Sequence, residues 1–277
     1  MSKSFELDEF KQQVADLYNH RSSTYDQGDF HPLVAHRLIE HARLRSGQKV
    51  LDIATGTGLV AIAAAKLVGS SGRVVGVDIS TGLLDQAKRK IKAARLSNID
   101  LVVADAENLN PDNSFDRVLC CCAIPFMTNL TADLRLWHRF LKPDGLIALQ
   151  VHAQTAFITG VVLQRVAQRY GVELIFSDLT GTEKKCYTLL QEAGFENVEV
   201  KTEQFGGYIS LSEAKAMWES SIKHPLCRPL LQLKPEQLEQ GKGEYFAELE
   251  TLVTDEGIWN DITTFFVLGR KAKGSKM

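Results

Sequence analysis

Two glycines stand between a short apolar segment and a longer one at residues 50–58, which read VLDIATGTG. Gly56 and Gly58 allow the backbone to approach a ligand closely, and a helix that follows them presents free N–H groups and the positive end of its dipole. Asp78 comes about twenty residues later, where a carboxylate at a strand end can accept two hydrogen bonds from a ribose diol. This spacing predicts a site for a ligand that contains a nucleoside.

Two further acids belong to the same pattern. Asp105 follows the third apolar segment in VVADAEN, and an ordinary turn in DAEN is its alternative role. Asp52 precedes the glycines and has capping of the next helix as its alternative, although it lies rather far upstream. Gly56-x-Gly58-x-x-Ala61 also fits the relaxed dinucleotide fingerprint, so an NAD(P)-dependent oxidoreductase is a rival. A carboxylate at Asp52 disfavours an anionic pyrophosphate and favours a ligand with a cationic group, such as S-adenosylmethionine.

These residues require a strand and helix alternation to bring them together. Short β-branched segments alternate with longer amphipathic ones, which predicts a parallel, doubly wound α/β sheet with right-handed crossovers. We expect about seven strands, the last one antiparallel. The predicted strands are 49–54, 73–78, 99–104, 115–121, 146–151, 197–203 and 261–268. The predicted helices are 7–19, 33–43, 59–68, 81–94, 130–140, 157–170 and 183–192.

The order of these segments predicts three parts. Residues 1–45 form an N-terminal helical lead-in or lid, in which Tyr25 and Phe30 either close over the ligand or staple the first helix to the sheet. Residues 46–204 and 258–271 form the Rossmann-like core. Residues 205–257 form a helical cap inserted before the last strand, and loops on a rigid scaffold are where selectivity usually lies. Trp218, Tyr208 and Phe126 are candidates for an acceptor pocket, with core packing as the alternative.

The motif series DIATGTG, GVD, DAENL, SFDRVLC and FLKPDGLIAL resembles that of class I S-adenosylmethionine-dependent methyltransferases. The form DIATGTG, with Ala54 where many members have glycine, most resembles the ubiquinone/menaquinone-biosynthesis C-methyltransferase branch and its small-molecule relatives. The resemblance covers roughly residues 20–151. The segment IPFMTNL and the size of the insertion depart from the quinone enzymes, so the resemblance implies the methyl donor but not a quinone acceptor.

The resemblance also implies roles for individual residues. It places a turn beneath the methionine part of S-adenosylmethionine, a carboxylate on its ribose hydroxyls, side chains around its adenine, and residues of the fourth strand end beside its sulfonium. In that order, the residues are Asp52, Ala54, Gly56 and Gly58 for the turn; Asp78 for the ribose; Ile79, Asp105 and Ala106 for the adenine; and Cys121, Cys122 and Ala123 for the sulfonium.

Methyl transfer from a sulfonium is an in-line displacement, so alignment of donor and acceptor supplies most of the acceleration. A base is needed only for a protonated acceptor. His152, directly after the fifth strand, is the preferred candidate base, with a hydrogen-bonded structural histidine as its alternative; His31 is the second candidate. A non-catalytic nucleoside-binding protein on the same fold is a further alternative function.

Composition limits the kinds of molecule that this protein is expected to bind. The 277 residues include 32 basic and 34 acidic side chains, a balance that carries no footprint for nucleic acid, so we expect a small organic acceptor. The acidic N-terminus and the lack of a long uncharged stretch predict a cytoplasmic protein without a membrane span. Five cysteines without a C-x-x-C pair predict no zinc site. Cys120, Cys121 and Cys122 are consecutive, and residues that alternate between strand faces cannot converge on one metal ion.

Overall fold

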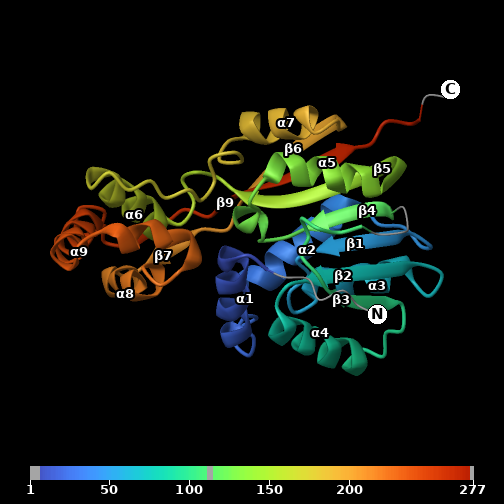
Figure 1. Ribbon diagram of the computed structural model, residues 1–277, viewed down its shortest axis with the longest axis horizontal. Helices are drawn as coiled ribbons and strands as arrows, with labels where there is room; N and C mark the ends of the chain where they lie inside the picture. The colour runs from blue at the N-terminus through green and yellow to red at the C-terminus, as the bar shows by residue number, and fades with distance from the viewer. Residues whose placement is uncertain (1–6, 111–114, 275–277) are drawn as a thin grey trace. The chain divides into compact units, whose positions relative to one another are not determined.

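A computed structural model describes residues 7–110 and 115–274. The strands are β1 (Lys49–Ile53), β2 (Arg73–Asp78), β3 (Ile99–Val103), β4 (Phe115–Cys120), β5 (Leu141–His152), β6 (Glu196–Gln204), β7 (Gly207–Ile209), β8 (Ile258–Asn260) and β9 (Thr263–Arg270). Seven of them form one sheet in the order β3-β2-β1-β4-β5-β9-β6, and β7 pairs with β8. Helices flank the larger sheet (Figure 1).

The α-helices are α1 (Glu9–Arg21), α2 (Phe30–Ala42), α3 (Leu59–Val68), α4 (Thr81–Ala93), α5 (Leu130–Phe140), α6 (Ile158–Arg169), α7 (Glu183–Glu192), α8 (Leu211–Ser221) and α9 (Pro235–Glu250). Two 3-10 helices, η1 (Ile124–Phe126) and η2 (Pro225–Gln232), complete the described elements. Residues 1–6 of the predicted lead-in lie outside the described part of the chain.

Buried parallel strands form the centre of the sheet. β1 pairs in parallel with β2 through Leu51 and Val75, and with β4 through Leu51 and Val118. Every residue of β1 after Lys49 is buried, as expected for a strand covered on both faces. β2 and β3 lie on one side of β1, and β4 lies on the other side. The strand order therefore reverses at β1. Ligands bind at such switch points in open α/β sheets, beyond the carboxyl ends of the strands.

The last strand is antiparallel, as expected. The backbone N–H of Asp144 donates to the carbonyl of Lys271 (3.1 Å), whereas the N–H of Ala153 donates to the carbonyl of Thr263 (2.9 Å). Later residues of β5 therefore pair with earlier residues of β9. β5 begins at Leu141 instead of the predicted residue 146, because Leu141 pairs with Phe115 of β4 and the backbone of residues 144–145 bonds to Lys271. The segment KPDG is typical of a turn, but its backbone groups are bonded to the end of β9.

The chain divides into two compact units. The larger comprises residues 1–151, 183–201 and 266–277, and the smaller comprises residues 152–182 and 202–265. The smaller unit thus takes in residues 152–182 as well as the predicted cap, because α6 packs against α8 and α9. The insertion itself is helical except for β7, which pairs with β8 beyond its end.

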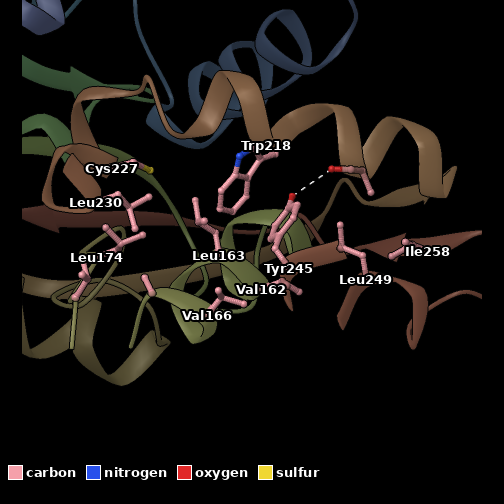
Figure 2. Packing of buried hydrophobic residues seen from close by; sticks show 13 residues of the cluster. Val162, Leu163, Val166, Leu174, Trp218, Cys227, Leu230, Tyr245, Leu249 and Ile258 are labelled. Atoms are coloured by element: carbon pink, nitrogen blue, oxygen red, sulfur yellow. Dashed lines mark hydrogen bonds between the residues drawn. The ribbon is translucent and has the colours of Figure 1, made fainter. Parts of the chain in front are cut away.

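The smaller unit has its own apolar core. Trp218 from α8 and Tyr245 from α9 pack with ring centroids 5.2 Å apart, and Val162, Leu163 and neighbouring side chains surround them (Figure 2). The Tyr245 hydroxyl donates a hydrogen bond to the carbonyl oxygen of Ala214 at 3.1 Å. Trp218 is only 4% exposed, so core packing accounts for it and an acceptor-pocket role does not.

None of the helices within residues 7–110 and 115–274 has the length and apolar character needed to cross a membrane. In the same part of the chain, no group of three or more His, Cys, Asp or Glu side chains is arranged to hold a metal ion.

Candidate active site

A cavity lies beyond the carboxyl ends of β1 to β4, entirely within the larger unit. The space between its walls is about 610 Å³, part of it open to solvent. Strand ends and the N-terminal helix together line it. The lining residues are Lys11, Val14, Tyr18, Tyr25, Ala54, Gly56, Val77, Asp78, Ile79, Ser80, Leu83, Ala104, Asp105, Ala106, Cys121, Cys122, Ala123, Phe126 and Met127. Seven of the predicted cofactor-binding residues are among them: Ala54, Gly56, Asp78, Ile79, Asp105, Ala106 and Cys121.

Asp78 is fixed at the centre of this wall. One carboxylate oxygen accepts the backbone N–H of Gly56 at 2.8 Å, and the other accepts the N–H of Ser80 at 2.8 Å. Burial raises the pKa of the Asp78 carboxyl to about 6, although backbone hydrogen bonds oppose the rise. The carboxylate therefore ties the β1 and β2 loops together, and its remaining lone pairs can accept hydrogen bonds from a ligand.

The glycine turn after β1 adopts a left-handed backbone at three positions. Ala54 and Gly56 have φ angles of 51° and 57°, and Gly58 has φ of 82°. Gly58 lines neither cavity described here. A Cβ on Gly58 would lie 3.2 Å from the Cβ of Ala87 in α4, so the absence of a side chain permits close packing there. Gly58 thus acts on the site through the shape of the turn.

Asp52 lies in a second, smaller cavity that adjoins the first. Its lining residues are Tyr25, His31, Ala35, Asp52, Ala54, Thr55, Gly56, Thr57, Leu59, Val60, Cys121 and Cys122. The Asp52 carboxylate accepts the Thr55 hydroxyl at 2.6 Å and the backbone N–H of Ala61 in the first turn of α3. Asp52 thus lies beside the turn that leads into α3, and both its predicted role in the donor site and its alternative role as a helix cap stay predictions.

Asp105 lies both at the cavity and in a turn. It lines the larger cavity, and its oxygens accept the Glu107 N–H at 3.1 Å and the Asn108 side-chain amide at 3.1 Å, as in an Asx turn. The carbonyl of Ala106 accepts the indole N–H of Trp137 at 3.1 Å, which fixes the loop on α5.

The cysteine run differs from the expected alternation. Cys120 is fully buried on β4, but the sulfurs of Cys121 and Cys122 lie 3.8 Å apart and both line the two cavities. The reason is the backbone of Cys122, which leaves the strand with φ of 55° and donates its N–H to the Gln150 side chain at 2.8 Å. The hydrogen bond with Cys122, together with burial, raises the pKa of the Cys121 thiol well above its usual range, which keeps it protonated.

The two candidate histidines have different surroundings. His152 belongs to the smaller unit and is not among the lining residues of either cavity. Its Nδ1 lies 3.4 Å from the Thr264 hydroxyl and its ring contacts Phe157, which matches the structural alternative. The role of His152 as a base stays a prediction. His31 lines the smaller cavity and stacks on Tyr25 with ring centroids 4.4 Å apart.

Several lining residues escaped the sequence analysis. Lys11 and Tyr18 come from α1, where a single lysine and a tyrosine on an amphipathic helix give no pattern that distinguishes them from surface or core residues. Tyr18 packs edge-on against Tyr25 and Phe126, with centroids 5.8 and 5.5 Å apart. Tyr18 and Tyr25 of the predicted lid therefore form part of the cavity wall, whereas Phe30 is not among the lining residues of either cavity.

The buried Asp52 carboxyl makes stability depend on pH. Burial raises its pKa from 3.8 to about 7, so the folded chain holds this proton more tightly than the unfolded chain. Its stabilising contribution is full below pH 4 and is lost as the pH rises through 7. Between pH 5.5 and pH 8, we expect the free energy of unfolding of the parent chain to decrease. In Asp52→Asn this decrease should be smaller by about 2 kcal/mol. Chemical denaturation at both pH values measures this difference. Equal falls in both proteins contradict it, and Asp85→Asn on the surface of α4 is the control.

The chain is similar to known methyltransferases in sequence and in fold. Residues 50–145 match the model of a methyltransferase domain. The chain is 32% identical over 218 residues to demethylmenaquinone methyltransferase of Staphylococcus saprophyticus, covering 69% of this chain and 91% of that protein. It is 31% identical over 196 residues to the ubiquinone/menaquinone biosynthesis C-methyltransferase of Coxiella burnetii, covering 67% and 77%. A solved structure of Haemonchus contortus phosphoethanolamine N-methyltransferase 2, in complex with phosphomonomethylethanolamine and S-adenosylhomocysteine, has the same fold, with a TM-score of 0.60, 16% identity and coverage of 96% and 61%.

A doubly wound sheet with a glycine turn and acids at three adjacent strand ends defines a Rossmann-like nucleoside-binding enzyme. The chain belongs to the class I S-adenosylmethionine-dependent methyltransferases, and among them it resembles the ubiquinone/menaquinone C-methyltransferase branch. Its cofactor is S-adenosylmethionine. Both the oxidoreductase and the non-catalytic alternatives are thereby set aside.

Proposed function

We propose that this enzyme transfers the methyl group of S-adenosylmethionine to a small organic acceptor, and that the two adjoining cavities hold the donor. The supporting observation is their arrangement: Tyr25, Ala54, Gly56, Cys121 and Cys122 line both of them. A ligand that extends from one cavity to the other passes the end of β4. That position suits the reacting centre, because acids and loops on either side can fix the two ends of the donor.

In this proposal each strand end has one task. Asp78 accepts the ribose hydroxyls, and Ile79, Asp105 and Ala106 surround the adenine. Asp52 and the turn at Ala54 and Gly56 hold the methionine end, where a buried carboxylate favours a cationic group. Gly58 maintains the turn. Bound S-adenosylmethionine supplies a methyl group on a positively charged sulfur, which is the electrophile.

The chain contributes alignment and exclusion of water rather than covalent chemistry. Cys121 presents a protonated thiol beside the proposed position of the sulfonium, so it does not compete with the acceptor as a thiolate. Tyr18, Tyr25 and Phe126 shield the cavity, and in-line alignment of donor and acceptor provides the rate enhancement. We propose that residues 205–257 help to select the acceptor; exposed Tyr208, packed edge-on against Trp259 at 5.2 Å, is available for this role.

Thermal unfolding with S-adenosylhomocysteine and with NAD tests the donor site. At 100 times its dissociation constant, S-adenosylhomocysteine should add about 2.7 kcal/mol to the free energy of unfolding, whereas NAD should add nothing. Release of S-adenosylhomocysteine from the donor, measured with a panel of small phenolic, quinol and amine acceptors, then tests the transfer. Stabilisation by NAD alone contradicts the proposed site, and stabilisation without acceptor-dependent release across the panel contradicts the proposed acceptor class.

A further inference from the structure

The N-terminal segment of residues 11–26 bonds to all three loops that end β1, β2 and β3. The Thr57 hydroxyl donates to Asp26 at 2.7 Å in the first loop. In the second loop, the side-chain oxygen of Asn19 accepts the Ser80 hydroxyl and the Gly82 N–H, each at 2.8 Å. In the third loop, Lys11 contacts Asp105. One short segment thus fastens each wall of the larger cavity.

The third of these contacts is a buried ion pair. The Lys11 ammonium lies 3.3 Å from Asp105 and 2.5 Å from Glu107, and the Lys11 side chain is only 4% exposed. Glu107 in turn accepts the backbone N–H of Thr128 at 2.7 Å, in the segment that precedes α5. Lys11 therefore joins α1 to the loop after β3 and, through Glu107, to the segment before α5. A buried ammonium is stable only where carboxylates compensate its charge.

Negative charge is in excess around Lys11. Besides Asp105 and Glu107, Asp133 on α5 lies near, and its Oδ2 has no hydrogen-bond partner among the described residues. Removal of the lysine would leave these carboxyls to repel one another, so Asp105 would move away from Glu107 or take up a proton.

Asp105 retains room for a ligand while it is held in this way. Its Oδ1 accepts hydrogen bonds from Lys11 and from the Glu107 N–H, whereas within residues 7–110 and 115–274 its Oδ2 accepts one, from the Asn108 amide at 3.1 Å. A carboxylate oxygen can accept two hydrogen bonds, so Oδ2 can receive an exocyclic amino group. Lys11 thus bonds to Oδ1 and leaves Oδ2 for that role.

We infer that Lys11 is a positioning residue for the donor: its ion pairs with Asp105 and Glu107 orient Asp105 toward the nucleobase and fasten α1 across the cavity. The inference rests on the proposed donor site. It makes Lys11 a determinant of both nucleobase selectivity and the lifetime of the bound donor, because Lys11 holds Asp105 and α1, which both line the cavity, in place.

The test compares S-adenosylhomocysteine with S-inosylhomocysteine, in which a carbonyl replaces the 6-amino group of adenine. In Lys11→Met we expect the dissociation rate of S-adenosylhomocysteine to rise about tenfold, and the preference for the adenine ligand to fall toward equality. Lys11→Arg should restore most of both. Because Lys11→Met leaves carboxylates unpaired, the double variant Lys11→Met/Glu107→Gln, which removes one of them, serves if the single variant does not fold.

Lys88→Met is the matched control. Lys88 forms an ion pair with Asp85 on the surface of α4, where each side chain is 60% exposed. A folded Lys11 variant that keeps both the dissociation rate and the adenine preference overturns the inference. So does a lower melting temperature accompanied by unchanged selectivity, which is the result of a merely structural lysine. Failure of the parent chain to bind either ligand would instead contradict the proposed donor site.

Discussion

Asp78→Ala is expected to raise the dissociation constant of S-adenosylhomocysteine at least a hundredfold, equivalent to about 3 kcal/mol of binding free energy. Two losses combine in this variant. The ribose hydroxyls lose a charged acceptor, and Gly56 and Ser80 lose the carboxylate that fixes their N–H groups at 2.8 Å. The loop that must contact the methionine end is therefore released together with the ribose site.

The stability of this variant should change much less than its affinity. The Asp78 carboxyl has its pKa raised to about 6 by burial, so its removal also relieves the cost of a buried charge at pH 8. Titration calorimetry at pH 8 gives the affinity, and Asp85→Ala on the exposed surface of α4 should bind as the parent chain does. Asp78→Asn, which keeps an acceptor oxygen, should lie between them. An affinity within threefold of the parent in Asp78→Ala would exclude the proposed ribose contact.

Trp218→Ala should remove about 3 to 5 kcal/mol from the stability of the smaller unit. The side chain is 4% exposed and packs on Tyr245 inside the cluster seen in Figure 2, so its truncation leaves a large cavity. Because that cluster lies within one compact unit, we expect unfolding to separate into two transitions, with the smaller unit first. Chemical denaturation followed by circular dichroism measures both.

The neighbouring Met217 offers a matched control, since its side chain is 40% exposed and Met217→Ala should cost well under half as much. Tyr245→Phe removes the hydrogen bond to Ala214 but keeps the ring, at a cost of about 1 kcal/mol. Equal losses in Trp218→Ala and Met217→Ala would show that the cluster does not carry the stability of the unit. Binding of S-adenosylhomocysteine at low temperature should persist in Trp218→Ala, because the larger unit supplies every lining residue of both cavities.

Local patterns were sufficient for the central elements of the fold. The bounds of β2, α3, α5 and α7 are those predicted, because their apolar periods and turn signals agree. They were insufficient where backbone pairing between distant segments decides: β5 begins at Leu141 because this residue pairs with Phe115 of β4, and β7 forms inside a region predicted as helical. The contents of the smaller unit, too, depend on packing between segments far apart in the sequence.

In the candidate site, too, local patterns predict some features, whereas contacts between distant segments determine others. Spacing alone placed Asp78 and Asp105 on one cavity wall, because carboxyl ends of parallel strands meet at one edge of a sheet. The converging sulfurs of Cys121 and Cys122 depend on one positive φ angle, which no residue type at that position indicates. Lys11 and Asp105 are 94 residues apart in the sequence, and the path of α1 brings them together. The residues next to Lys11 in the sequence therefore do not indicate this contact.

The position of β9 between β5 and β6 has a consequence for synthesis on the ribosome. Every other strand of the sheet precedes β9 in the chain, yet β9 occupies an interior place. Until it emerges, β5 presents an open edge of unpaired backbone, and such edges recruit other chains. While residues 153–262 are being translated, the edge of β5 in the nascent enzyme therefore stays unpaired. We expect holdase chaperones to bind the nascent chain during this period.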